Sequence, residues 1–251
     1  MFTVVSYFGK SSEVKQFGLY YFITPTTLTE AFQRLEKIGA NLRSRSNQGN
    51  KKDGDSNLRR ASVFVPFCRD QDHKPSILVT LRSSNLVTHK WEVSFPGGKE
   101  SRKDGGDVIE TAVRETIEEL GIDRNSLKTY GVLKPIIRPK HNSSIYPVLG
   151  YLDYDFSRQN LTDFNSSEVE KVILIPLEKA CKAEYWNYTH WKSGWVTPIY
   201  HDDICNGRQI PRIWGLTASL MSMILKIVLP QHFKGCKSEG KNRPRAIDNG
   251  Q

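Results

Sequence analysis

The stretch RETIEELGI, residues 114–122, places one arginine and three glutamates within nine positions, and it decides the interpretation of the whole chain. With about 100° between successive residues of a helix, its three glutamates share one arc of roughly 100°. The sequence therefore predicts an amphipathic helix with a concentrated acidic face and an opposite core-facing stripe. The glutamates are Glu115, Glu118 and Glu119, and the stripe consists of Ile109, Val113, Ile117 and Leu120.

The acidic face of this helix is either a solvated surface or a metal site. Like charges three or four residues apart cost a helix a few tenths of a kcal/mol per pair, so the cluster favours a bound cation. Mg²⁺ prefers carboxylate oxygens and commonly shares its shell with water and substrate phosphates. Gly121 stands where a helix end is expected. We therefore expect a divalent-metal site on a helix that ends near Gly121.

The size of the chain, 251 residues with 38% hydrophobic and 25% charged residues, suits one domain of about 150 to 200 residues with tails. No run approaches the roughly 18 apolar residues of a membrane span. The four cysteines are widely spaced, which indicates neither a disulfide framework nor a zinc site and suits a reducing, intracellular compartment.

The net charge of +9 comes mainly from the two ends of the chain. Residues 1–60 hold ten Lys and Arg against five acids, and residues 232–251 hold five against two. A basic tail can help binding to anionic surfaces, but the body lacks the electrostatic footprint of a DNA-binding protein. We therefore expect no specific nucleic-acid partner.

Three segments are predicted along the chain. Residues 1–60 form an extension with one amphipathic helix, which starts at Thr27 with a capping box to Glu30, followed by a polar linker. Residues 61–231 form the main domain, and residues 232–251 form a basic tail. The start lacks a secretory signal and has no arginine before residue 34, and the chain ends RAIDNGQ rather than in a Ser-Lys-Leu type signal. Mitochondrial and cytosolic locations both stay open.

Short runs rich in β-branched and aromatic residues lie on both sides of the acidic helix. A further helix is expected from about Gly215, ended by Pro230. Strands around one central helix, with more helix at the end, predict an α/β sandwich around a mixed sheet. The expected strands are ASVFVPFC, SILVTLRS, WEVSF, YGVLKPII, IYPVLGYLD and KVILIPL.

Just before the acidic helix, Pro96 is followed by Gly97 and Gly98. Two glycines after a proline form a tight turn whose backbone can approach a ligand, and a carbonyl there can join a metal shell. A plain hairpin turn is the alternative.

Together these motifs closely resemble the box of the Nudix hydrolases. Arg114-Glu115, Glu118-Glu119, Gly121 and Ile122 match its second half, with Thr116 in an aliphatic position. The first half departs from the box, because Gly106 stands where a glutamate is usual and Glu100 where a glycine is usual. An enlarged loop in which Asp104 or Asp107 replaces that glutamate would restore the pattern.

The segment LVTLRSSNLVTHKWEVSFPGGK, residues 78–99, is similar to the one that precedes the box in the coenzyme A diphosphatase branch. Two departures are Val87 or Thr88, where a basic residue is usual, and Trp91, where a glycine is usual. The likeness spans about residues 60–228. It implies a Nudix-type α/β/α sandwich with the catalytic helix after the Gly-Gly loop.

The resemblance also implies roles for individual residues. Metal ligands would be Glu115, Glu119, Glu118 and Gly98 through its carbonyl, with Mg²⁺ or Mn²⁺ as the cofactor. Arg114 would fix Glu115, and Glu168 in SSEVEK would serve as general base, although an acid before a strand is often only a surface charge. Contacts to the substrate are expected from Arg82, Ser83, Gly97 and Lys99, with an ordinary strand-end arginine as the alternative for Arg82.

The implied activity is Mg²⁺-dependent hydrolysis of the diphosphate in coenzyme A or its thioesters. The products would be 3′,5′-ADP and 4′-phosphopantetheine or its acyl derivative. Another nucleoside diphosphate derivative, such as ADP-ribose or NADH, is the alternative substrate. A catalytically silent Nudix-like binding module is the alternative of a different class, and the sequence leaves the oligomeric state open.

Overall fold

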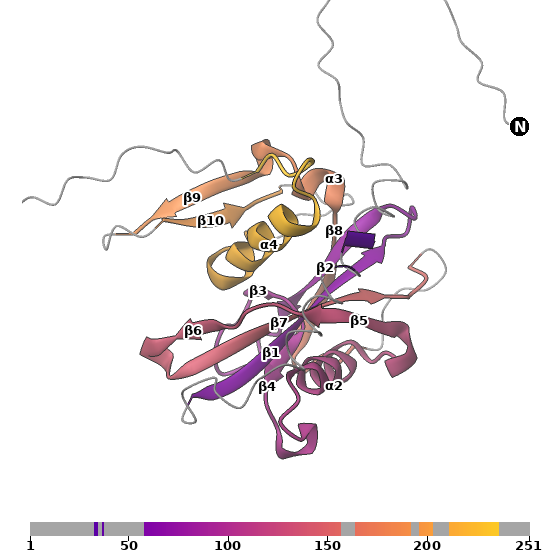
Figure 1. The fold of residues 1–251 in the computed structure, drawn as a ribbon, viewed down its shortest axis with the longest axis vertical. Coiled ribbons are helices and arrows are strands. Elements are labelled where there is room, and N and C mark those ends of the chain that lie inside the picture. Colours follow the sequence, from indigo (N-terminus) through magenta and orange to yellow (C-terminus); the bar gives the residue numbers. More distant parts are fainter. Residues whose placement is uncertain are drawn as a thin grey trace, which may run out of the picture.

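The computed structural model describes residues 33–34, 37, 58–156, 164–191, 196–202 and 211–235. Within these ranges, helix α2 (Val108–Leu120) covers one face of a mixed sheet and helix α4 (Gly215–Val228) covers the other (Figure 1). This confirms the α/β/α sandwich expected from the sequence.

The central sheet of the described residues has eight strands, in the order β3-β2-β1-β7-β5, with β4 beside β1, β6 beside β7 and β8 beside β2. Strands β1 and β7 are parallel, and the other pairs are antiparallel, which makes the sheet mixed. The strands are β1 (Arg59–Arg69), β2 (Pro75–Arg82), β3 (Val93–Ser94), β4 (Gly97–Lys99), β5 (Leu127–Val132), β6 (Ile136–Arg138), β7 (Ser143–Leu152) and β8 (Val169–Pro176).

Alternation along β1 divides the core into two layers. Phe64 packs with Ala112 and Val113 of α2, whereas Val65 and Phe67 belong to the larger apolar cluster that contains residues of α4. Because both faces of the sheet are covered, β1 is apolar along most of its length instead of alternating with polar residues. Positions of one parity on β1 therefore face α2, and the others face α4.

A hairpin of β9 (Trp186–His190) and β10 (Val196–Tyr200) lies beside α4, and the sequence analysis missed it. Its polar residues and Pro198 hide the alternation that marks a strand. Trp186 packs edge-on against Tyr200, with ring centroids 5.3 Å apart, and joins the hairpin to the core. The short helix α3 (Leu177–Ala180) connects β8 to this region.

The predicted terminal segments lie almost entirely outside the described residues. Gln33, Arg34 and Lys37 are helical, but the capping and apolar positions of the expected N-terminal helix are outside the described part, so that helix stays a prediction. The basic tail beyond Gly235 is likewise outside it. Of the helices that are described, none is long and apolar enough to cross a membrane.

Candidate active site

The Gly97-Gly98 turn brings the backbone of β4 against β1 on one side and against α2 on the other. A Cβ at Gly97, where φ is +149°, would lie 2.3 Å from the carbonyl oxygen of Ser62 on β1. A Cβ at Gly98 would lie 2.3 Å from Oε2 of Glu115. The two glycines therefore serve different purposes: Gly97 permits the strand pairing, and Gly98 leaves room for a carboxylate.

Helix α2 is capped at both ends, by Asp107 and by Gly121. Asp107 is the N-cap, with its carboxylate accepting a hydrogen bond of 2.8 Å from the Ile109 N–H. Gly121 follows the last helical residue with φ of +64°, as expected for a C-terminal glycine. Thr116, in the aliphatic position of the box, is buried and donates its hydroxyl to the carbonyl of Ala112.

The three glutamates on the acidic face of α2, Glu115, Glu118 and Glu119, lie in different environments. Glu119 is only 3% exposed, whereas the side chain of Glu118 is 56% exposed. The side chain of Glu115 is 17% exposed and rests against Gly98. The helical wheel predicted one shared face, but the Gly-Gly turn covers that face unevenly, so the glutamates cannot act as equivalent ligands.

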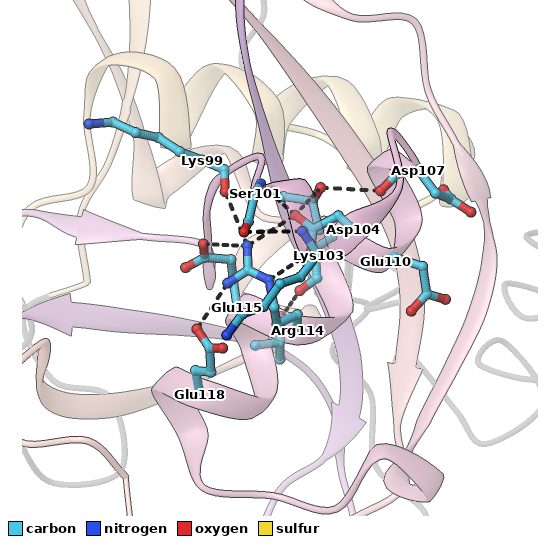
Figure 2. A network of polar contacts seen from close by, with 12 residues as sticks. Lys99, Ser101, Lys103, Asp104, Asp107, Glu110, Arg114, Glu115 and Glu118 are labelled. Carbon is cyan, nitrogen blue, oxygen red and sulfur yellow. Dashed lines mark hydrogen bonds and ion pairs between the residues drawn. The ribbon is translucent and has the colours of Figure 1, made fainter.

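Arg114 joins four parts of the site through one guanidinium (Figure 2). It donates to both carboxylate oxygens of Asp104, at 2.7 and 3.1 Å, and to the Lys99 carbonyl at 3.1 Å. It also donates to Glu115 and Glu118, each at 2.9 Å. The guanidinium is planar, so this set of contacts fixes the position of Glu115 relative to β4.

Asp104 is the partner of Arg114, and Asp107 is not. Asp104 ends the 3₁₀ turn η1 (Arg102–Asp104), where its carboxylate also accepts hydrogen bonds from the Ser101 N–H at 2.7 Å and the Thr111 hydroxyl at 3.0 Å. The hydrogen bond from Arg114 holds the pKa of this buried carboxyl well below its usual range. Of the two acids in the enlarged loop, the geometry thus supports Asp104 as the replacement for the box glutamate.

Asp104→Asn is expected to lower the free energy of unfolding by about 2 kcal/mol, because it removes a buried charged acceptor that pairs with the partly buried Arg114. Asp107→Asn is the matched control, and we expect a change of a few tenths of a kcal/mol, since asparagine caps a helix as well as aspartate does. Urea denaturation at pH 7 measures both. Equal losses in the two variants would contradict the distinct role of Asp104.

Glu119 is the most perturbed carboxyl of the site. Burial raises its pKa to about 8, opposed by the charge of Arg82 and a hydrogen bond from the Gly97 N–H and assisted by the negative charges of Glu168 and Glu115. Burial likewise raises the pKa of Glu115 against the effect of Arg114. Both glutamates therefore lie where an added positive charge would be stabilising.

The residues present fit a divalent cation. Oε2 of Glu119 is buried and has no hydrogen-bond partner among the described residues, which leaves a carboxylate oxygen available as a ligand. The Glu115 carboxylate lies in the same region, against Gly98. Within the described ranges, no three His, Cys, Asp or Glu side chains are already gathered as a coordinating group, and Arg114 pairs with both Glu115 and Glu118.

The raised pKa of Glu119 predicts how stability depends on pH in chelator-treated protein. Between about pH 4.5 and 8 the folded state binds more protons than the unfolded state, so stability falls as pH rises through this window. We expect a loss of about 2 kcal/mol from pH 6 to pH 8, reduced by millimolar Mg²⁺. Urea denaturation at both pH values, with Glu119→Gln as the control, measures it. The same slope in wild type and Glu119→Gln would contradict the assignment.

The other predicted residues lie around the same centre. The Ser83 N–H donates to the Glu168 carbonyl at 2.8 Å, which joins the end of β2 to the start of β8. Glu168 interacts electrostatically with Glu115 and Glu119, and Arg82 interacts with Glu119. Ser83 is buried, and its hydroxyl caps the turn at Asn85.

Lys99 contributes through its backbone rather than its side chain to the Arg114 network. Its carbonyl accepts from Arg114, while its ammonium extends away from Glu115 and Glu118 (Figure 2). Neighbouring positions on a strand face opposite sides, so the contact of Gly98 with Glu115 directs Lys99 to the other face.

Asn165 is a positioning residue that the sequence analysis missed. Its N–H donates to the carbonyl of Glu119 at 3.0 Å, and its side-chain amide lies 3.4 Å from the Glu168 carboxylate. It thereby ties the loop of Glu168 to α2. The signal in the sequence was the run Asn-Ser-Ser before the glutamate, which is typical of a turn closed by an asparagine side chain.

The chain is similar in sequence to several known proteins. Residues 58–194 match the model of the NUDIX domain. The chain is 38% identical over 182 residues to the mouse "Mitochondrial coenzyme A diphosphatase NUDT8", with 69% of this chain and 80% of the relative covered. It is 37% identical to the human protein of that name, and the match covers 68% of this chain and 70% of the human protein. It is 32% identical to "Nudix hydrolase 3" of Caenorhabditis elegans, and the match covers 72% of this chain and 78% of that protein.

Proposed function

The chain belongs to the Nudix family of hydrolases, and from this premise we propose that it hydrolyses the diphosphate of coenzyme A or its thioesters with Mg²⁺. The products would be 3′,5′-ADP and 4′-phosphopantetheine or its acyl derivative. The names of the mouse and human relatives support this substrate, and so does the resemblance of residues 78–99 to the coenzyme A diphosphatase branch.

The observation that carries the proposal is the buried Glu119 carboxylate, with one oxygen that has no partner in the described part of the chain, beside Glu115 and the Gly-Gly turn. A carboxylate buried this way is costly unless a cation compensates it. A catalytically silent module would have no need for that arrangement. The alternative of a silent binding module is therefore less favoured.

Glu119 and Glu115 would hold the metal, with the Gly98 carbonyl as a further ligand and Glu118 available once it leaves Arg114. A divalent cation bound there supplies positive charge to the diphosphate oxygens and lowers the pKa of a water. Arg114 holds Glu115 in place, and Asp104 holds Arg114. The protein thus fixes one ligand through two successive, partly buried ion pairs before the substrate arrives.

Glu168 would act as the general base that removes a proton from the attacking water. It lies on the loop that Asn165 ties to α2, near enough to Glu115 and Glu119 to interact with both carboxylates. Arg82, at the adjoining end of β2, would bind a phosphate oxygen, because a guanidinium matches phosphate geometry. As a carboxylate, Glu168 would accept the proton of the water while the water oxygen bonds to phosphorus.

Product analysis by chromatography tests the proposal. Purified protein is incubated with Mg²⁺ and coenzyme A, dephospho-coenzyme A, ADP-ribose or NADH, beside the Glu119→Gln variant. Release of 3′,5′-ADP from coenzyme A, absent in the variant, would support the proposed substrate. Cleavage of ADP-ribose or NADH alone would overturn it and leave Nudix chemistry in place. No cleavage, with thermal stability unchanged by Mg²⁺, would support the binding module.

For the compartment, we propose mitochondria. The mouse and human relatives and a plant relative, "Nudix hydrolase 15, mitochondrial", carry that location in their names. Fractionation of cells that express the chain with a C-terminal tag distinguishes mitochondria from cytosol.

A further inference from the structure

Three cations share one face of the sheet, on β4 next to the Gly-Gly turn, on β1 and on β6. Arg59 and Arg138 both lie opposite Ser143 of β7, one on each side of it, and Lys99 lies opposite Ala61 of β1. Arg59 and Ala61 have the parity of Val63 and Val65, which pack in the cluster that contains α4. We call Arg59, Lys99 and Arg138 the cationic strip.

Two further contacts place the cationic strip on the face away from α2. Gly98 faces Glu115, so Lys99 faces the opposite side, as its direction in Figure 2 shows. Ile136 packs against the cluster of α4, and Arg138 follows it by two positions on β6. With strands about 4.8 Å apart, the arginines lie roughly 10 Å from each other across β7, within reach of one ligand for such long side chains.

The charge of the cationic strip is uncompensated in the described part of the chain. Arg59 donates to the neutral carbonyl of His141 at 2.9 Å, and none of the three cations forms an ion pair with a described carboxylate. By contrast, neighbouring Arg60, on the α2 face, pairs with Glu100 at 3.2 Å. Uncompensated cations of one sign favour an anionic ligand.

We propose that the cationic strip binds a second phosphate of the substrate, a phosphomonoester separate from the diphosphate that is cleaved. The inference rests on the proposed function, in which coenzyme A carries a 3′-phosphate with a charge of about −1.5 to −2 near pH 7. Among the described strands β4 pairs only with β1, so a ligand at Gly98 can pass over its free edge to reach Lys99. The strip would then select coenzyme A over dephospho-coenzyme A.

Steady-state kinetics of Arg59→Gln, Arg138→Gln and the double variant test this proposal, with coenzyme A and dephospho-coenzyme A as substrates. We expect the KM for coenzyme A to rise about tenfold in each single variant with kcat unchanged, and the KM for dephospho-coenzyme A to stay constant. Lys74→Gln is the matched control, since it removes an exposed charge at the opposite end of β1. Thermal melting confirms that the variants are folded.

An equal rise in KM for both substrates in the variants would overturn the proposed role of the cationic strip, and so would a wild type with no preference between the substrates. Either result would leave the proposed function standing. If wild type cleaves neither substrate, the proposed function fails. Calorimetric measurement of the affinities for 3′,5′-ADP and 5′-AMP then tests whether the cationic strip binds the 3′-phosphate. Tighter binding of 3′,5′-ADP that weakens about tenfold in Arg138→Gln would support the strip. Equal affinity for the two nucleotides would refute it.

Discussion

Glu119→Gln is expected to lower kcat/KM for the diphosphate substrate by about a thousandfold or more, equivalent to about 4 kcal/mol of transition-state stabilisation. The amide retains the size of the side chain but removes the charge that would bind the cation. Because Glu119 is buried with a pKa raised to about 8, its replacement also removes a costly buried charge. The variant should therefore be as stable as metal-free wild type at pH 8, or more stable, while being nearly inactive.

The control for Glu119→Gln is Glu110→Gln on the same helix. Glu110 pairs with Arg124 at 2.6 Å on the surface, and its side chain is 42% exposed. A surface ion pair contributes little, so activity should stay within twofold and stability within about 0.5 kcal/mol. Steady-state kinetics and urea denaturation measure both variants. Glu119→Gln with at least one tenth of wild-type activity would exclude Glu119 as a metal ligand.

Gly98→Ala is expected to lower kcat/KM about a hundredfold with little loss of stability. The new Cβ would overlap the Glu115 carboxylate, which lies at the end of a flexible side chain and can move away. The chain still folds, but Glu115 leaves its position beside Glu119 and strains its contact with Arg114. A displacement of about 1 Å in a catalytic site costs about this much in rate.

Gly97→Ala, at the neighbouring position, is the comparison for Gly98→Ala and should mainly lower stability. Its Cβ would meet the Ser62 carbonyl and the Val63 Cα, both backbone atoms of β1, at a φ that side chains rarely adopt. We expect a loss of about 3 kcal/mol in the free energy of unfolding as the pairing of β4 with β1 is strained. Thermal melting and kinetics of both variants decide. A fully active Gly98→Ala would show that Glu115 does not need its present position.

The position of Asp104 shows why the first half of the box was harder to interpret than the second. Helix α2 repeats every 3.6 residues, so spacing alone orders its side chains. The loop before it has no such period, and a sequence match cannot distinguish Asp104 from Asp107. The structure separates them by their contacts, since one carboxylate meets Arg114 and the other caps α2.

The sequence by itself determined the amphipathic helix with its glycine end, the glutamates and arginine it carries, most strands of the sheet and the family resemblance. These features depend on the spacing of residues close together in the chain, which is present in the sequence itself. Only the tertiary structure decided that Glu119 is buried while Glu118 is exposed, that Asp104 holds Arg114, and that Asn165 brings Glu168 to α2. It also brought Arg59, Lys99 and Arg138 to one face. These features depend on which strand or turn covers a side chain, and therefore on contacts between segments far apart in the sequence.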